Sequence, residues 1–298
     1  MTSALALRTE RLSPSVREEW DDFVGRSPEA GFMQSWAWGE FKRSCGQDVV
    51  RLGVFDEDNS LCGGAAVYYV RSSLGASPLE VPHGPVFCSE PALAGQAAGE
   101  LMAELRCLAG EVRSPAVRIE PFREELPPGM REGFVRAPLD LVPTPTRLVA
   151  VGRSDEELLA AMESKGRYNV RLALKKGVEA GCHSGTEALR DFYSLFELTS
   201  LRHGFSGESL AFFDQMLQCL GGRSPQARIY LAHYKGMLAA AAVVVFFGRR
   251  ATYLYGGSSP FLGPVMAPYA LHWRIMQDAR AAGCAEYDLY GVAPEGMP

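Results

Sequence analysis

Two periods of apolar residues run along this chain and divide it into predicted strands and helices. Aromatic and β-branched runs predict strands at 49–54, 63–70, 116–120, 228–233, 238–247, 251–259 and 285–292. Helical spacing predicts helices at 15–24, 92–112, 154–162, 165–177, 186–205, 210–219 and 267–283. Helices and strands follow one another in both halves, so the pattern predicts an α/β (α+β) fold with mixed sheets flanked by helices.

A proline-rich stretch separates the two halves. Residues 125–146 contain five prolines, at 127, 128, 138, 143 and 145, which makes this stretch the best candidate for a connection. We therefore predict two domains, 1–145 and 146–298, which repeat one architecture without a close repeat of sequence.

The stretch 251–292 is predicted to form a strand, a helix and a second strand of one sheet. Each predicted strand ends in a tyrosine followed by a glycine, Tyr255-Gly256 and Tyr290-Gly291. The carboxyl ends of strands are where α/β sheets bind ligands, and a glycine there lets a ligand approach the backbone. The same residues also fit two buried core tyrosines with two turn glycines, so the pattern alone leaves both interpretations open.

The composition is that of a soluble globular protein, with 47% hydrophobic and 22% charged residues. The net charge of −5 excludes a general polyanion binder, so a contact with nucleic acid or phosphate requires a local basic patch. The 7 cysteines are scattered and never spaced CxxC, which favours reduced thiols over disulfides or a zinc site. The sequence shows neither a signal peptide nor an apolar run of membrane-spanning length, so we expect a cytoplasmic protein.

Two segments carry candidate binding chemistry. The segment 32–42 combines two tryptophans with Lys42, which suits either an aromatic wedge packed on the sheet or a pocket whose rim lysine holds a phosphate. The segment 164–177 has positive charges and no negative one, and Arg167, Arg171 and Lys175 would share a helix face by their spacing. Such a stripe is usually a solvated face, but in an acidic protein it is also a candidate polyanion contact.

The chain lacks the sequence motifs of nucleophilic and metal-dependent catalysis. A serine nucleophile elbow, a P-loop, a GxGxxG after a strand and an HExxH are all absent. This favours transfer from an already activated acyl donor to an amine, because positioning and oxyanion stabilisation supply most of the rate of such a reaction. We expect no metal and no bound cofactor.

Six segments of the chain resemble the FemABX family of aminoacyl-tRNA-dependent peptidyltransferases. They occur in family order and cover most of the chain, at 34–42, 82–86, 162–177, 201–205, 253–258 and 287–291. The resemblance implies two tandem GNAT-like domains. It also implies transfer of an amino acid from aminoacyl-tRNA, as co-substrate, to the side-chain amine in the stem peptide of a peptidoglycan precursor.

The resemblance also implies roles for individual residues. Lys42, beside Trp38, and Arg202 would hold the phosphates of the precursor, and Tyr255 with Gly256 would line the peptide channel. The basic residues Arg167, Arg171 and Lys175 are assigned to the tRNA acceptor arm from their charge alone. No catalytic residue is carried over.

The chain departs from the family pattern in four places. His83 stands where arginine is common, Phe87-Cys88 where an acidic residue is common, and Phe212-Phe213 where a tyrosine often helps to bind the precursor. Family members continue into a Phe-Lys-containing return segment, which we expect to be missing after Pro298. An acyl-CoA-dependent N-acyltransferase on the same fold and a noncatalytic tRNA- or precursor-binding protein therefore stay as alternatives.

The acceptor itself is left open between UDP-MurNAc-pentapeptide and lipid II. A peripheral membrane contact is expected only if the precursor is lipid-linked. A monomer is the favoured oligomeric state.

Overall fold

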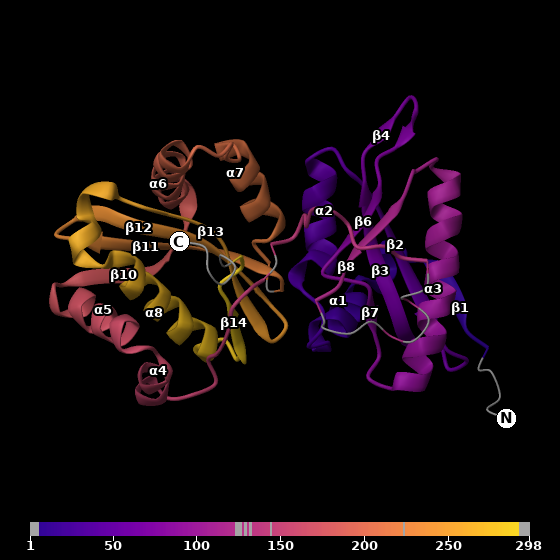
Figure 1. The fold of residues 1–298 in the computed structure, drawn as a ribbon, viewed down its shortest axis with the longest axis horizontal. Coiled ribbons are helices and arrows are strands. Elements are labelled where there is room, and N and C mark those ends of the chain that lie inside the picture. The colour runs from indigo at the N-terminus through magenta and orange to yellow at the C-terminus, as the bar shows by residue number, and fades with distance from the viewer. Residues whose placement is uncertain are drawn as a thin grey trace. The chain divides into compact units, whose positions relative to one another are not determined.

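The computed structural model describes residues 6–122, 127, 130, 133–143, 145–222 and 224–291. The chain divides into two compact units, 1–142 (unit 1) and 143–298 (unit 2), each with a mixed sheet and helices on both faces (Figure 1). The predicted boundary at 145/146 falls in the same proline-rich stretch. The predicted α/β class is confirmed.

Unit 1 contains the predicted helices and strands in the expected order, together with further elements that were not predicted, among them β1, α2 and β6. Its elements are β1 (Arg8–Arg11), η1 (Pro14–Val16), α1 (Arg17–Arg26), η2 (Phe32–Gln34), α2 (Trp36–Ser44), β2 (Asp48–Phe55), β3 (Leu61–Tyr69), β4 (Arg71–Ser72), β5 (Gly75–Ala76), β6 (Leu79–Pro82), β7 (Val86–Phe87), α3 (Pro91–Glu111) and β8 (Val117–Glu120). The main sheet has the order β1-β2-β3-β6-β8, with β7 paired to β3. All pairings in it are antiparallel except that of β6 with β8.

Helix α3 packs on one face of this sheet, and α2 packs on it together with α1 on the other (Figure 1). The sequence of α3 explains its position, because Ala97, Leu101, Leu105 and Leu108 recur at helical spacing and are all buried. They meet strand residues such as Leu52 in one apolar core, where each large side chain contributes roughly 1.5–3 kcal/mol. The core therefore fixes the sheet whose other face carries α2.

Unit 2 contains the second mixed sheet. Its elements are β9 (Leu148–Ala150), α4 (Asp155–Ala161), α5 (Ser164–Lys175), β10 (Val178–His183), α6 (Gly185–His203), α7 (Leu210–Cys219), β11 (Gln226–Tyr234), β12 (Met237–Phe247), β13 (Arg250–Ser258), η3 (Pro260–Val265), α8 (Ala267–Ala281) and β14 (Glu286–Asp288). The sheet order is β10-β11-β12-β13-β14-β9, and only β13 and β14 pair in parallel. Helices α5 and α8 lie on one face of it, and α6 and α7 on the other (Figure 1).

Two local predictions fail at element ends. Helix α1 runs through Gly25 to Arg26, so the expected stop at residue 24 is wrong; burial of Trp20 and Val24 holds the helix against the core up to that point. The strand predicted at 285–292 is confined to β14, because Tyr290 and Gly291 adopt φ of 44° and 73°, which a strand does not accommodate. Among the described residues, none of the helices has both the length and the apolar composition needed to cross a bilayer.

Candidate functional site

The first turn of helix α2 is fixed by hydrogen bonds from two sides. Ser35 is its N-cap, and the Ser35 hydroxyl accepts from the Trp38 N–H at 3.3 Å and donates to the Phe32 carbonyl at 2.6 Å. The Trp36 N–H donates to Asp21 Oδ1 on α1 at 2.6 Å. These bonds anchor the helix that carries both predicted unit 1 site residues.

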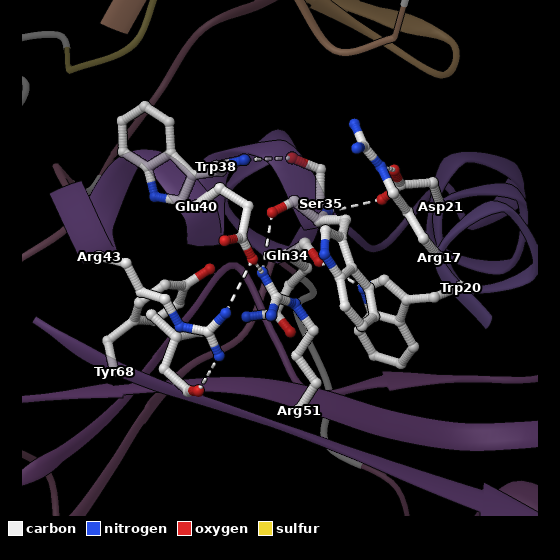
Figure 2. Close-up of polar contacts among 12 residues, drawn as sticks. Arg17, Trp20, Asp21, Gln34, Ser35, Trp38, Glu40, Arg43, Arg51 and Tyr68 are labelled. Atoms are coloured by element: carbon white, nitrogen blue, oxygen red, sulfur yellow. Dashed lines mark hydrogen bonds and ion pairs between the residues drawn. The ribbon is translucent and has the colours of Figure 1, made fainter. Parts of the chain in front are cut away.

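A buried arginine, Arg51 on β2, ties α2 to the sheet (Figure 2). Its Nη2 donates to the Trp36 carbonyl at 2.8 Å and to Glu40 Oε1 at 3.0 Å, and its guanidinium lies 3.9 Å from the centre of the Trp36 ring. Burial lowers the pKa of Arg51 and raises the pKa of the nearby Asp21 carboxyl to about 6. This network is absent from the sequence prediction, because its members come from α1, α2 and β2.

The Gln34 side chain bridges β3 and β6, which pair directly at a single position. Gln34 Oε1 accepts from the Ala66 N–H at 2.7 Å, and Nε2 donates to the carbonyls of Ala66 at 3.2 Å and of Pro82 at 2.7 Å. The amide therefore satisfies backbone groups that a neighbouring strand would otherwise pair. A Cβ on Gly84 would lie 2.6 Å from Gln34 Cδ, so glycine is required there.

The two predicted substrate residues of unit 1 are neighbours on α2. Trp38 is 5% exposed, and its ring packs against Phe32 and Phe41 with centres 4.9 and 5.0 Å apart. This is the aromatic-wedge arrangement, in which Trp38 supports the helix from inside. Lys42 is half-buried, and its Nζ lies 6.0 Å from the centre of the Trp38 ring. Burial raises the pKa of Glu80 on β6, and the positive charge of Lys42 acts in the opposite direction by lowering it.

His83, one of the departures from the family pattern, is a buried residue of unit 1. Its ring packs edge-on against Phe32 and Phe122, with centres 5.6 and 5.2 Å away, and its backbone φ is 55°. A cavity of about 860 Å³ in unit 1 lies elsewhere, between α1, the β2–β3 turn and the start of α3. None of the predicted site residues lines this cavity.

In unit 2 the structure brings Tyr255 and Arg202 to the same end of β13. The Tyr255 ring packs edge-on against Phe196 on α6 and Phe213 on α7, with centres 5.8 and 5.0 Å away. Arg202, in the last turn of α6, donates from Nη1 to the carbonyl of Ser258 at 3.4 Å. The Arg202 side chain is exposed and Tyr255 is half-buried.

A bulge at Leu254 breaks the alternation of β13. Tyr253 pairs with Val244 and Tyr255 with Val243, so Leu254 is the extra residue. As a result Tyr253 faces α8, where its ring lies 4.8 Å from that of His272, while Tyr255 faces α6 and α7.

Gly256 belongs to the same region, where β13 runs on past β14. A Cβ at Gly256 would lie 1.9 Å from the Tyr253 hydroxyl, which makes glycine necessary. His272 Nδ1 lies 2.7 Å from the Tyr287 hydroxyl, and burial lowers the pKa of His272 to about 4. The sequence prediction missed this buried His–Tyr pair. The expected match of the two Tyr-Gly pairs is also wrong, because Tyr255-Gly256 lies within β13 and Tyr290-Gly291 beyond β14.

The basic stripe on α5 is only partly available to a ligand. Arg167 turns back and donates from Nη1 to the carbonyls of Leu159, Ala160 and Met162 at 3.2, 3.3 and 2.9 Å, which caps the end of α4. Arg171 and Lys175 are exposed. The prediction of one three-residue contact face is therefore corrected to these two.

The described part of the chain holds no group of three or more residues suited to bind a metal ion. All seven cysteines are free thiols.

Two family models match the chain, one in each unit. The model of the FemAB family matches residues 16–123, and that of the acetyltransferase (GNAT) domain matches residues 164–295. Among proteins of similar sequence is the lipid II:glycine glycyltransferase of Staphylococcus haemolyticus (strain JCSC1435), 22% identical over 93% of this chain and 83% of the relative. The protein of the same name from Staphylococcus aureus (strain MRSA252) is 20% identical with the same coverage.

Solved structures share the fold. A crystal structure of FemX superposes with a TM-score of 0.83 over 97% of this chain and 90% of that one, at 19% identity. A tandem GNAT protein from the clavulanic acid biosynthesis pathway has a TM-score of 0.54 over 98% of this chain and 92% of that one, at 13% identity. The expected pair of tandem GNAT-like domains is thus confirmed.

Proposed function

Because this chain belongs to the FemABX family, we propose that it is an aminoacyltransferase that adds an amino acid to the stem-peptide side-chain amine of a peptidoglycan precursor. One observation carries the proposal: the similarity to lipid II:glycine glycyltransferases extends over 93% of this chain and thus through both units. A shared GNAT-like fold alone would not separate this chemistry from other acyl transfers.

The donor we propose is aminoacyl-tRNA. The acceptor amine attacks the ester carbonyl, a C–N bond forms, the bond to the ribose oxygen breaks, and the proton lost by the amine ends on that oxygen. The ester is already activated, so the protein has to align the two groups and exclude water. Such a reaction requires neither a protein nucleophile nor a metal.

We assign binding roles to four residues that are exposed or half-buried. Lys42 and Arg202 hold precursor phosphates, and Tyr255 with Gly256 borders the peptide. Trp38 acts through Lys42, because the tryptophan ring is buried beneath it.

A transfer assay tests the proposal with two labelled donors, a mixed aminoacyl-tRNA pool and acetyl-CoA. The acceptors are a UDP-linked muramyl pentapeptide and its lipid-linked form. Label that reaches either peptide from tRNA and disappears after RNase treatment supports the proposal. Label from acetyl-CoA alone supports the second candidate, an acyl-CoA-dependent N-acyltransferase, which the GNAT-domain match over 164–295 favours. Precursor binding without turnover of either donor favours a noncatalytic binding protein.

A further inference from the structure

One end of unit 2 is defined by the register of its sheet. Val178 at the start of β10 pairs with Tyr234 on β11, and Tyr234 pairs with Met237 on β12. Ala240 on β12 pairs with Ser258, the last residue of β13. The start of β10, the β11–β12 turn and the end of β13 therefore lie side by side.

Two helices end at the same place. Lys176, just after α5, donates from Nζ to the Pro264 carbonyl of η3 at 2.6 Å. Arg202, in the last turn of α6, donates to the Ser258 carbonyl at 3.4 Å. The short helix η3 is thus bordered by α5 from one face of the sheet and by α6 from the other. We call these segments together the η3 end of unit 2.

Large apolar side chains are exposed at the η3 end. Phe261 on η3 is 87% exposed and Leu201 on α6 is 74% exposed, and the others are Leu174, Phe205 and Met237. Exposed apolar groups that gather on one surface mark a site of interaction.

The η3 end is also positively charged. Its exposed cations are Arg171, Lys175, Lys176, Lys235 and Arg202. Its exposed acids are fewer: Glu179, Glu197 and Glu208. This local excess of positive charge stands against a net charge of −5 for the whole chain.

We propose that the η3 end docks on an anionic lipid bilayer, with Phe261, Leu201 and Met237 entering the interface while the cations face the headgroups. Leucine and methionine side chains favour lipid over RNA as the partner, because single-stranded RNA is held by aromatic rings that stack on bases. The inference rests on the proposed function in one respect, since docking would bring the enzyme to a precursor that is itself lipid-linked.

Co-sedimentation of the full chain with vesicles tests the inference. We expect binding to phosphatidylglycerol-containing vesicles that weakens with salt, and little binding to pure phosphatidylcholine. The double variant Phe261→Ser/Met237→Ser should lower the affinity about tenfold or more, because two apolar groups no longer enter the interface. Lys235→Glu should lower it about thirty-fold, since it changes the charge by two units.

Matched controls lie away from the η3 end. Leu74→Ser removes a 92% exposed leucine at the β4–β5 hairpin of unit 1, and Lys165→Glu reverses a charge in the first turn of α5, at its opposite end. Both should bind vesicles like the wild type. Absence of binding to phosphatidylglycerol vesicles at low salt, or wild-type binding by the Phe261/Met237 variant, overturns the inference. Binding of tRNA that Lys235→Glu abolishes, with no vesicle binding, overturns it in favour of an RNA contact.

The transfer assay separates this inference from the proposed function. The docking variants should retain transfer to the UDP-linked acceptor and lose most transfer to the lipid-linked acceptor in vesicles. Vesicle binding without transfer to any acceptor supports docking and refutes the proposed function. Transfer without vesicle binding refutes docking and supports the function.

Discussion

Replacing Asp21 with asparagine isolates the effect of a buried carboxylate beneath α2. The Asp21 side chain is 14% exposed, accepts the Trp36 N–H, and has its pKa raised by burial from 3.8 to about 6. At about 1.36 kcal/mol for each pKa unit, ionised Asp21 lowers the free energy of unfolding by about 3 kcal/mol. The folded state binds this proton more tightly than the unfolded chain, so the group's contribution to stability falls as pH rises from about 4 to about 6 and stays low above that range.

Asparagine keeps an oxygen that accepts the Trp36 N–H, and it does not titrate. The unfolding free energy of Asp21→Asn relative to wild type should therefore rise by about 3 kcal/mol between about pH 4 and about pH 7. At neutral pH the variant should be the more stable protein, although it lacks the attraction of Asp21 to Arg17 and Arg51.

Urea unfolding followed by tryptophan fluorescence measures this difference. Of the 4 tryptophans, Trp20, Trp36 and Trp38 lie in unit 1, so the signal reports mainly on the unit that contains Asp21. The control is Asp22→Asn, whose carboxylate is 72% exposed and should change the pH profile little. Parallel pH profiles for wild type and Asp21→Asn would refute the reasoning, because they would mean that Asp21 titrates alike in the folded and unfolded states.

Three further predictions concern positions near the candidate site. Lys42→Ala should raise the KM for the precursor about 10- to 100-fold with little change in kcat, through loss of a charge-assisted phosphate contact, while Lys165→Ala should leave steady-state kinetics unchanged. Gly256→Ala should lower the melting temperature, because its Cβ would lie 1.9 Å from the Tyr253 hydroxyl; Tyr253→Phe in the same chain should restore part of the loss, and no rescue would contradict this contact. Gln34→Leu should lower the unfolding free energy by about 2–4 kcal/mol in urea, because it leaves buried backbone groups of β3 and β6 without partners.

Local chemistry was predictable from the sequence where it depends on near neighbours. The helix predicted at 154–162 is α4, which a capping box of Ser154 and Glu157 starts, and α8 begins at Ala267 as its apolar spacing predicts. The expectation that one sheet holds both strands of the 251–292 stretch is confirmed, since β13 pairs with β14. In each case the residues that determine the structure are close together in the sequence, within one helix or one strand–helix–strand stretch.

The support beneath the candidate site was not predictable in the same way. Gln34 bonds to Ala66 and Pro82, 32 and 48 residues further along the chain, and no periodicity marks such contacts. Arg167 shows the opposite case: helical spacing assigned it to a basic face, but a long side chain also reaches nearby carbonyls, and here it caps α4. The roles of Lys42, Arg202 and Tyr255 stay predictions.

Because of the bulge at Leu254, the length of β13 as well as its residue types determines which side chains lie on each face of the unit 2 sheet. Tyr253 and Tyr255 are two positions apart and would point to the same side of a regular strand, but the bulge places them opposite the consecutive residues Val244 and Val243 and therefore on opposite sides. Deleting Leu254 would leave Tyr253 and Tyr255 as consecutive residues of a regular strand, each facing the side that it faces now, whereas deleting a paired residue such as Thr252 would shift the register and exchange the two faces. In related chains, loss of one residue at the bulge would therefore preserve which side chains face α8 and which face α6 and α7, whereas the same loss elsewhere in the strand would exchange them, a difference that a comparison of aligned residue types would not reveal.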